Sequence, residues 1–430
     1  MLSLPERRSP KKSKKTDFPS TSVIGSYPIT VPETEIEQYK AFPEETEDPV
    51  NSTIQLAVRD FISAGIEFPS SGQTRESFVR LFLDPKYVEG IEYDGAEILV
   101  TGKIKRKAPI RLQDVQEAKT QVPKYYGFKE PITDPYTLAR NCRLKGSHYS
   151  DIKELTFAIA REIVRPELES IQSLVDYLQL DAPYFSVEPF KEYFQELYEE
   201  MLNGLTAPIV LHVCGDTFSI FKELTKLNVD VISLDFTFND KLLAEVARRN
   251  FDQQIGLGCV NTGSPIVEPV KTISGLIQRT SKALSESRIR FVHPACGERN
   301  LPLDVAYQKN INLTLARNEV FLGAPQSARS VNLSEEEYDP NGYFLIQVDL
   351  QSQQIVVSFN SYDNMPKFRV QSSSGEKLIA AIVDNKIISD TEHGKRHLGY
   401  VGYEIGKAET ALKNRVPYRQ DKPLSIPGIY

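Results

Sequence analysis

Short apolar runs alternate with longer segments in which apolar residues recur every three or four positions, most regularly between residues 177 and 318. The runs have the length of buried strands, and the periodic segments have the length and spacing of amphipathic helices. Strands that alternate with helices form parallel sheets, because a parallel connection must cross over the sheet. The pattern predicts strands at 177–181, 208–214, 229–235, 254–260 and 289–293, and helices at 190–203, 217–227, 239–249, 266–285 and 303–318.

The preceding part of the chain follows the same alternation less regularly. It has apolar runs at 22–28 and 65–69, helical periodicity over 51–64 and 150–178, and a strand-rich stretch at 87–122 that we expect to contribute part of the barrel. About eight strand ends over roughly 310 residues suit an eight-stranded parallel barrel. We therefore expect an α/β fold with a (β/α)8 TIM barrel at residues 20–328.

The hydrophobic pattern changes after Ser327, where a polar stretch at 334–342 follows. Beyond it the pattern predicts a β-hairpin and two helices, at 343–350 with 354–360, at 374–386 and at 396–414. These elements are too few to extend the barrel. We expect a separate small α+β domain at residues 338–430.

Composition changes this picture little. The chain has 430 residues, 40% of them hydrophobic, and a formal net charge of −7. A negative chain is a poor ligand for nucleic acid, so we expect none as the main partner. No apolar run is long enough to span a membrane. Six Lys and Arg between positions 7 and 15 could contact RNA or an acidic partner, but we expect residues 1–19 to be a disordered solubilising tail.

The four cysteines do not form a disulfide framework, because four in 430 residues is too sparse for one. Cys214 and Cys296 each end an apolar run and are each followed by glycine. That placement favours a metal or redox role in a reducing compartment, which we expect to be the cytosol. Cys142 and Cys259 are expected to have no such role, Cys259 as part of the core.

Ligand-type side chains gather at three predicted strand ends. His212 and Cys214 are two residues apart, so in a strand their side chains project to the same side. Asp235 and Cys296 end two later strands. Imidazole, thiolate and carboxylate are zinc ligands. A buried cysteine often only packs, and it is the convergence of three strand ends that predicts a zinc site.

Four motifs lie in a fixed order along the barrel region: Ser22-Val-Ile-Gly-Ser26-Tyr-Pro28, Leu180-Asp181-Ala-Pro183, His212-Val-Cys214 and His293-Pro-Ala-Cys296-Gly297. With these motifs, residues 20–325 resemble the catalytic barrel of cobalamin-independent methionine synthase, and most closely the short archaeal-type enzymes. The resemblance implies that Gly25 and Ser26 hold the carboxylate of homocysteine. It also implies that Asp181 takes the ammonium group, and we assign Asp181 the catalytic role.

The resemblance further implies that His212, Cys214, Asp235 and Cys296 bind Zn²⁺, with Asp235 in the place of a glutamate. Other positions depart from the family pattern. Gln73, which we expect to contact substrate, stands where the long enzymes have a glutamate that contacts the ammonium group. Ala182 replaces a glutamate as well, and Gly263 replaces a histidine implicated in protonating the folate leaving group.

The region 338–425 resembles an uncharacterised domain that is appended to various proteins, some of them tied to pterin or one-carbon metabolism. The resemblance rests on Asp339-Pro-Asn-Gly-Tyr-Phe344, on His397-Leu-Gly-Tyr-Val-Gly-Tyr-Glu404 and on Gln420-Asp-Lys-Pro-Leu424. Recruitment of a partner or of the methyl donor is one role it implies.

Two thiolates and a carboxylate would leave zinc electron-rich, which suits alkyl transfer to a bound sulfur better than hydrolysis. We therefore predict a methyltransferase that makes methionine from homocysteine. Its donor is expected to be a methylcobamide or a corrinoid protein rather than a methyl-pterin, because Gly263 offers no acid for a pterin leaving group. His293 could replace that acid. Transfer to another thiol such as coenzyme M, or a zinc-containing binding protein without activity, are the alternatives.

Overall fold

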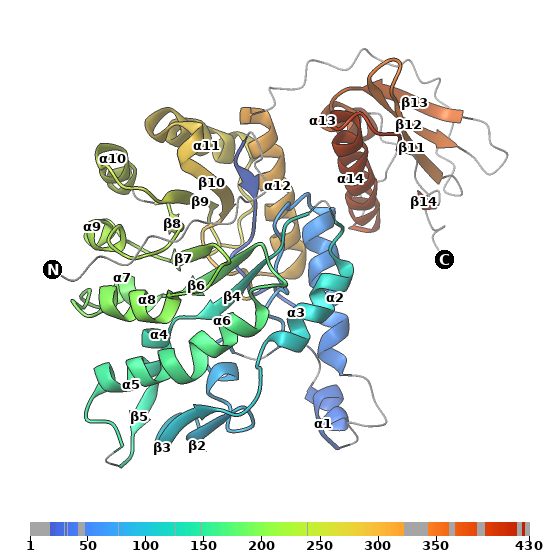
Figure 1. Ribbon diagram of the computed structural model, residues 1–430. Coiled ribbons are helices and arrows are strands. Elements are labelled where there is room, and N and C mark those ends of the chain that lie inside the picture. Colours follow the sequence, from blue (N-terminus) through green and yellow to red (C-terminus); the bar gives the residue numbers. More distant parts are fainter. Residues whose placement is uncertain are drawn as a thin grey trace.

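The computed structural model describes residues 18–321 except 30, 32, 42–47, 76, 125, 147 and 239, and residues 343–418 and 424–425 except 361–365 and 385–391. Almost all of the expected N-terminal tail lies outside these residues. Figure 1 shows a large α/β region and a smaller one that contains the C-terminal elements.

The large region is built on a seven-stranded, fully parallel sheet. Its strands, in spatial order, are β1 (Ser20–Thr21), β10 (Ile289–Pro294), β9 (Gln254–Val260), β8 (Val231–Asp235), β7 (Ile209–Val213), β6 (Tyr177–Asp181) and β4 (Lys129–Thr133). The last five strands of the sequence prediction coincide with β6 to β10. Almost every residue of these five strands is buried, as expected for a parallel sheet covered by helices.

The segment 65–69 lies between β1 and β4. Phe68 forms a single parallel bridge with Ser22, and its amide donates to the carbonyl of Thr21 at 3.0 Å. On the other side, the amide of Gly127 donates to Glu67 and the amide of Lys129 donates to Pro69, each at 3.0 Å. The expected second strand is therefore present as one bridge with hydrogen bonds to both neighbours.

Helices lie around the outside of this sheet (Figure 1). They are α1 (Glu33–Ala41), α2 (Pro49–Ser63), α3 (Leu112–Gln121), α4 (Pro135–Arg140), α5 (Ile152–Ile159), α6 (Arg165–Ile171), α7 (Tyr184–Val187), α8 (Phe194–Leu202), α9 (Phe221–Leu224), α10 (Asp240–Arg248), α11 (Val270–Leu284) and α12 (Leu303–Phe321). The expected long helix at 150–178 is divided. A π-helical turn at Ala160–Val164 joins α5 to α6, because Pro166 has no amide to donate back to the preceding turn. Helix α9 is shorter than the expected 217–227.

The strand-rich stretch at 87–122 does not belong to the seven-stranded sheet. It forms an antiparallel hairpin of β2 (Val88–Asp94) and β3 (Glu97–Arg106), and β5 (Cys142–Leu144) adds to it in a separate three-stranded sheet. Helix α3 follows the hairpin. The expectation that this stretch forms part of the barrel was wrong in this respect, because its strands pair with each other.

The C-terminal elements form a four-stranded antiparallel sheet with two helices. The sheet has the order β13 (Pro366–Ser372), β12 (Gln354–Asn360), β11 (Tyr343–Asp349), β14 (Leu424–Ser425), and the helices are α13 (Gly375–Asp384) and α14 (Glu392–Lys413). Their apolar core is separate from that of the large region. No helix in the described part of the chain is both long and apolar enough to cross a membrane.

Helix α14 packs against α2 (Figure 1). Gly399 lies against Ser63, where a Cβ would come within 3.0 Å of the serine Cβ, and the rings of Tyr403 and Tyr126 have centroids 6.0 Å apart. Ser63 ends α2 and Tyr126 precedes β4, so these contacts are at the amino-terminal ends of the strands.

Candidate metal centre and amino-acid site

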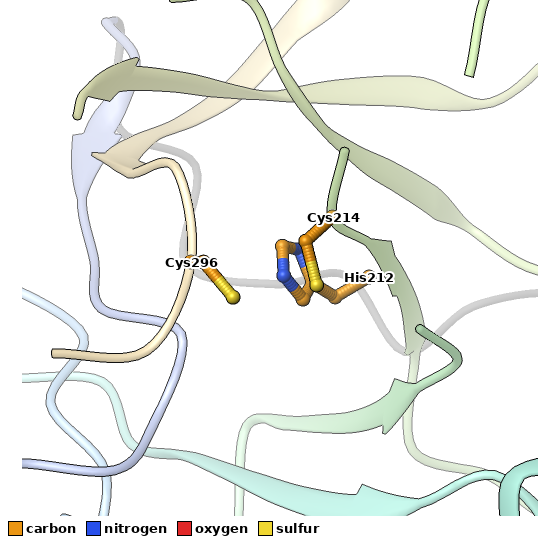
Figure 2. A group of neighbouring side chains, drawn as sticks. All are labelled: His212, Cys214 and Cys296. Atoms are coloured by element: carbon orange, nitrogen blue, oxygen red, sulfur yellow. The ribbon is translucent and has the colours of Figure 1, made fainter. Parts of the chain in front are cut away.

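Three of the expected ligands converge at the carboxyl-terminal ends of β7 and β10. His212, Cys214 and Cys296 form a group whose ligand atoms all lie within 4.8 Å of one another. Figure 2 shows the imidazole and the two sulfurs pointing toward one another. The sequence brings them together because parallel strands end at the same edge of the sheet, and β7 and β10 end in these residues.

Close packing of two loops fixes the position of Cys296. Gly297 follows Cys296, and a Cβ at this position would lie 2.1 Å from the hydroxyl oxygen of Ser26. The amide of Glu298 donates to the carbonyl of Ser26 at 2.8 Å. The loop that carries Cys296 is therefore attached to the turn that carries Ser26, so the metal group and the expected carboxylate contact form one structural unit.

Hydrogen bonds assign the proton on His212. His293 Nδ1 lies 2.7 Å from the carbonyl of Pro294, which can only accept, so Nδ1 carries the proton. Burial lowers the pKa of His293 well below its usual value, so the ring is neutral and its Nε2 accepts from Ser233 at 2.9 Å. The Ser233 oxygen then accepts from His212 Nδ1 at 3.1 Å.

In the neutral tautomer that these bonds favour, His212 Nε2 is the nitrogen without a proton. Among the described residues this buried nitrogen has no oxygen or nitrogen partner. A buried polar atom without a partner is costly. An unprotonated Nε2 that faces two sulfurs is the arrangement in which imidazole binds a metal ion.

The two thiols differ in acidity. The side chain of Cys214, followed by that of His212, lowers the pKa of Cys296 to about 4. The same pairing with Cys296, together with burial, raises the pKa of Cys214 well above its usual value. Cys296 is thus the more acidic thiol of the pair.

Asp235 lies at the end of the neighbouring strand β8 but outside the three-residue group. Its Oδ1 accepts from the amide of Thr237 at 2.8 Å and from the hydroxyl of Thr237 at 2.7 Å. Burial raises the pKa of Asp235, and Thr237 opposes that shift. The structure therefore brings together three of the four expected ligands.

The turn after β1 carries Gly25 and Ser26. Ser26 donates its amide to Gln73 Oε1 at 3.0 Å, and a Cβ on Gly25 would lie 2.5 Å from the same oxygen. Gln73 has φ 44°, a left-handed conformation that is uncommon for a side-chain-bearing residue and often marks a functional turn. All three residues are thus in contact, as expected for parts of one binding site.

Asp181 ends β6 and is 9% exposed. Burial raises its pKa to about 6, against the opposing effects of His212 and Gln179. Its Oδ1 accepts from Gln179 Nε2 at 2.6 Å. A carboxylate that is buried yet ionised near neutral pH is suited to bind an ammonium group.

Sequence reasoning missed Ser233 and Gln179. Each is a polar residue inside an apolar strand, two positions before an expected site residue, so its side chain shares that residue's face of the strand. This two-residue spacing could have identified both residues from the sequence. Cys259 is buried and lies 3.8 Å from the carbonyl of His293, while Cys142 is on β5, and neither belongs to the metal group.

Comparison with known proteins gives a consistent result over the same region. The family described as "Cobalamin-independent synthase, Catalytic domain" matches residues 18–317. A protein named methionine synthase from Methanocaldococcus jannaschii is 32% identical over 318 residues, which cover 69% of this chain and 97% of that protein. Its namesake from Methanothermobacter marburgensis is 30% identical over 311 residues, 70% of this chain and 99% of that protein.

A solved structure of a B12-independent methionine synthase from a Shewanella species, in complex with selenomethionine, covers 70% of this chain and 98% of its own with a TM-score of 0.60. At 20% identity this likeness shows the fold alone. A second family, described as PterinBD-DUF4346, matches residues 338–421.

Proposed function

Because the chain belongs to the family of the cobalamin-independent synthase catalytic domain, we propose that it transfers a methyl group to the sulfur of homocysteine to form methionine. One observation carries the proposal. The ligand atoms of His212, Cys214 and Cys296 lie within 4.8 Å of one another, and His212 Nε2 has no oxygen or nitrogen partner among the described residues.

The donor set fits zinc. One imidazole nitrogen and two sulfurs are the atoms that zinc binds in structural and catalytic sites, and an open position is typical of the catalytic ones. His212, Cys214 and Cys296 would hold the ion, and Asp235 would complete the protein ligands through Oδ2, since Oδ1 is bonded to Thr237. Zinc there would supply a thiolate from the substrate thiol at neutral pH.

The residues around the metal group position the substrate. Asp181 binds the ammonium group, which is its catalytic contribution, because it fixes the sulfur relative to the metal ligands. Gly25 and Ser26 receive the carboxylate, and Gln73 contacts the substrate beside them. Gln73 must release the Ser26 amide before that amide can bind the carboxylate. A sulfonate thiol such as coenzyme M has no ammonium group for Asp181, so an amino acid is the better acceptor.

The proposed donor is a methylcobamide or a corrinoid protein, not a methyl-pterin. The amine leaving group of a pterin needs an acid, which contributes roughly 10²–10⁴ in rate. Gly263 is exposed and donates its amide to the side chain of Asn261 at 2.8 Å. Glycine has no side chain, and the amide of Asn261 is not an acid at neutral pH, so neither residue can protonate the leaving group. His293 is buried with both ring nitrogens engaged by Pro294 and Ser233, which argues against its use as a substitute acid.

We further propose that the segment 65–69 completes an eight-stranded barrel between β1 and β4, and that the chain divides into units at 20–328 and 338–430. The hydrogen bonds of Glu67, Phe68 and Pro69 support closure, and the two apolar cores support the division. Four free cysteines favour a reducing compartment such as the cytosol.

One assay tests the function. Purified protein loaded with zinc is mixed with homocysteine and either methylcobalamin or methyltetrahydrofolate, with and without a chelator. Methionine formed from methylcobalamin and lost on chelation is the expected result. Transfer to coenzyme M but not to homocysteine would move the proposal to another thiol, and zinc binding without any transfer would leave a binding protein.

A further inference from the structure

A buried glutamine connects the two parts of the amino-acid site. Gln179 is on β6, is completely buried, and donates its Nε2 to Asp181 Oδ1 at 2.6 Å and to the carbonyl of Ile24 at 2.7 Å. Ile24 immediately precedes the Gly25–Ser26 turn. The side-chain amide of Gln179 therefore links Asp181, the expected ammonium contact, to the turn that carries the expected carboxylate contact.

A buried lysine lies behind this amide. Lys129, on β4 and 1% exposed, donates its Nζ to Gln179 Oε1 and lies over the ring of Phe291, 5.7 Å from its centroid. Burial lowers the pKa of Lys129 to about 7, while the charge on Asp181 acts in the opposite direction. An amine donates a hydrogen bond in either protonation state, so the contact with Gln179 persists across that pKa.

The partners fix the orientation of the amide. The carbonyl of Ile24 and the ionised carboxylate of Asp181 can only accept, so the amide nitrogen has to face both of them. The amide oxygen then faces Lys129, whose Nζ donates to it. The amide has no alternative orientation that satisfies all three neighbours, and Asp181 Oδ1 is held in place as a result.

We propose that Gln179 and Lys129 form a positioning pair that makes the site selective for thiols with an α-ammonium group. The pair holds the carboxylate of Asp181 at a fixed place relative to the Gly25–Ser26 turn. This inference rests on the proposed function, because it takes homocysteine as the substrate. Neither residue touches the metal group, so the pair acts on the amino-acid end alone.

The test measures the affinity of the zinc-loaded full chain for homocysteine and for 4-mercaptobutyrate, which is homocysteine without its amino group, by calorimetric titration. Wild-type protein should prefer homocysteine. Gln179→Leu leaves Asp181 Oδ1 and the Ile24 carbonyl without their donor, so homocysteine should bind roughly tenfold to a hundredfold more weakly. The affinity for 4-mercaptobutyrate should stay within about twofold, because that thiol makes no ammonium contact.

Gln179→Met is the second variant, because it keeps roughly the length of the side chain but has no amide nitrogen and no other donor for Asp181. It should lose the same preference with unchanged zinc content. Gln195→Leu is the matched control, since Gln195 is exposed on α8 and its amide donates to its helix neighbour Glu199. Equal losses for both thiols, or a Gln179→Met variant that still prefers homocysteine, would overturn the inference while the function stands. Wild-type protein that binds neither thiol would overturn both.

Discussion

Asp181 lies directly opposite His212 in the register of the neighbouring parallel strands β6 and β7. The expected ammonium contact and the imidazole of the proposed metal group are thus adjacent across one strand pair. Neighbouring strands are about 4.8 Å apart, which places the two ends of a small amino-acid thiol within reach of both residues. The register of β6 and β7 therefore sets the distance that the substrate has to span between its ammonium group and its sulfur.

Replacing either cysteine of the metal group should remove zinc. Cys214→Ala and Cys296→Ala each take one of the three converging ligands, and the remaining imidazole and single sulfur, even with Asp235, lack one of the two thiolates that the proposed site needs. Metal analysis of the purified variants should show zinc contents far below that of the wild type. Cys142→Ala is the control, because Cys142 is outside the group. Full zinc occupancy in either ligand variant would contradict the site.

Asp181→Asn should weaken homocysteine binding by about 2–5 kcal/mol, because the ammonium group loses its charged partner. The zinc content should be unchanged, since Asp181 is not in the metal group. Calorimetric titration with homocysteine and metal analysis of the same sample measure both. Unchanged affinity would reject the placement of the ammonium group.

Ser233→Ala should lower zinc affinity by roughly tenfold to a hundredfold, the usual effect of removing a partner that orients a metal-binding histidine. Without the Ser233 oxygen, the proton on His212 Nδ1 has no acceptor and the ring is free to carry its proton on Nε2. Competition with a chelating dye measures the affinity. Ser274→Ala, a buried serine of α11 distant in sequence from the ligands, should retain wild-type affinity.

The enzyme should use methylcobalamin and should not use methyltetrahydrofolate, because no acid lies at Gly263 and His293 is fully hydrogen-bonded. The test measures turnover with each donor, and the assay with methyltetrahydrofolate contains no corrinoid. Activity with methyltetrahydrofolate that His293→Ala abolishes would show instead that His293 supplies the proton.

Lys129→Met should change stability in a pH-dependent way. Burial lowers the pKa of Lys129 from 10.5 to about 7, so between these values the unfolded chain holds a proton that the folded chain has lost. Raising the pH through this window stabilises the wild type, and below about pH 7 the full cost of the buried charge is present. The melting temperature of Lys129→Met relative to wild type should therefore be higher at pH 6 than at pH 9. Lys153 is exposed and serves as the control. The melting temperature of Lys153→Met relative to wild type should be the same at pH 6 and at pH 9.

The strands, and the convergence of His212, Cys214 and Cys296 at their ends, were predictable because both depend on local sequence. Runs such as Ile209–Val213 are apolar throughout, and their ends carry the ligands. The position of Asp235 outside the metal group was missed, because the strand pattern does not show that the hydroxyl and amide of Thr237, two residues on, hold its carboxylate.

The bonds of Ser233 and Gln179 join residues far apart in the sequence, so they depend on strand register, which the apolar pattern alone does not give. The hairpin at Val88–Arg106 shows the same limit. Its alternating pattern indicates strands, but not which sheet they join.

The attachment of α14 to Ser63 and Tyr126 determines how a ligand of the C-terminal unit would reach the metal group. Those contacts are at the amino-terminal ends of strands about five residues long, and the metal group is at the opposite ends, so the two are separated by at least about 16 Å along the strand axis. A methyl carrier bound beside Ser63 and Tyr126 would have to leave these contacts to reach the metal group, or serve a second molecule. In the second case, delivery of the methyl group would depend on protein concentration.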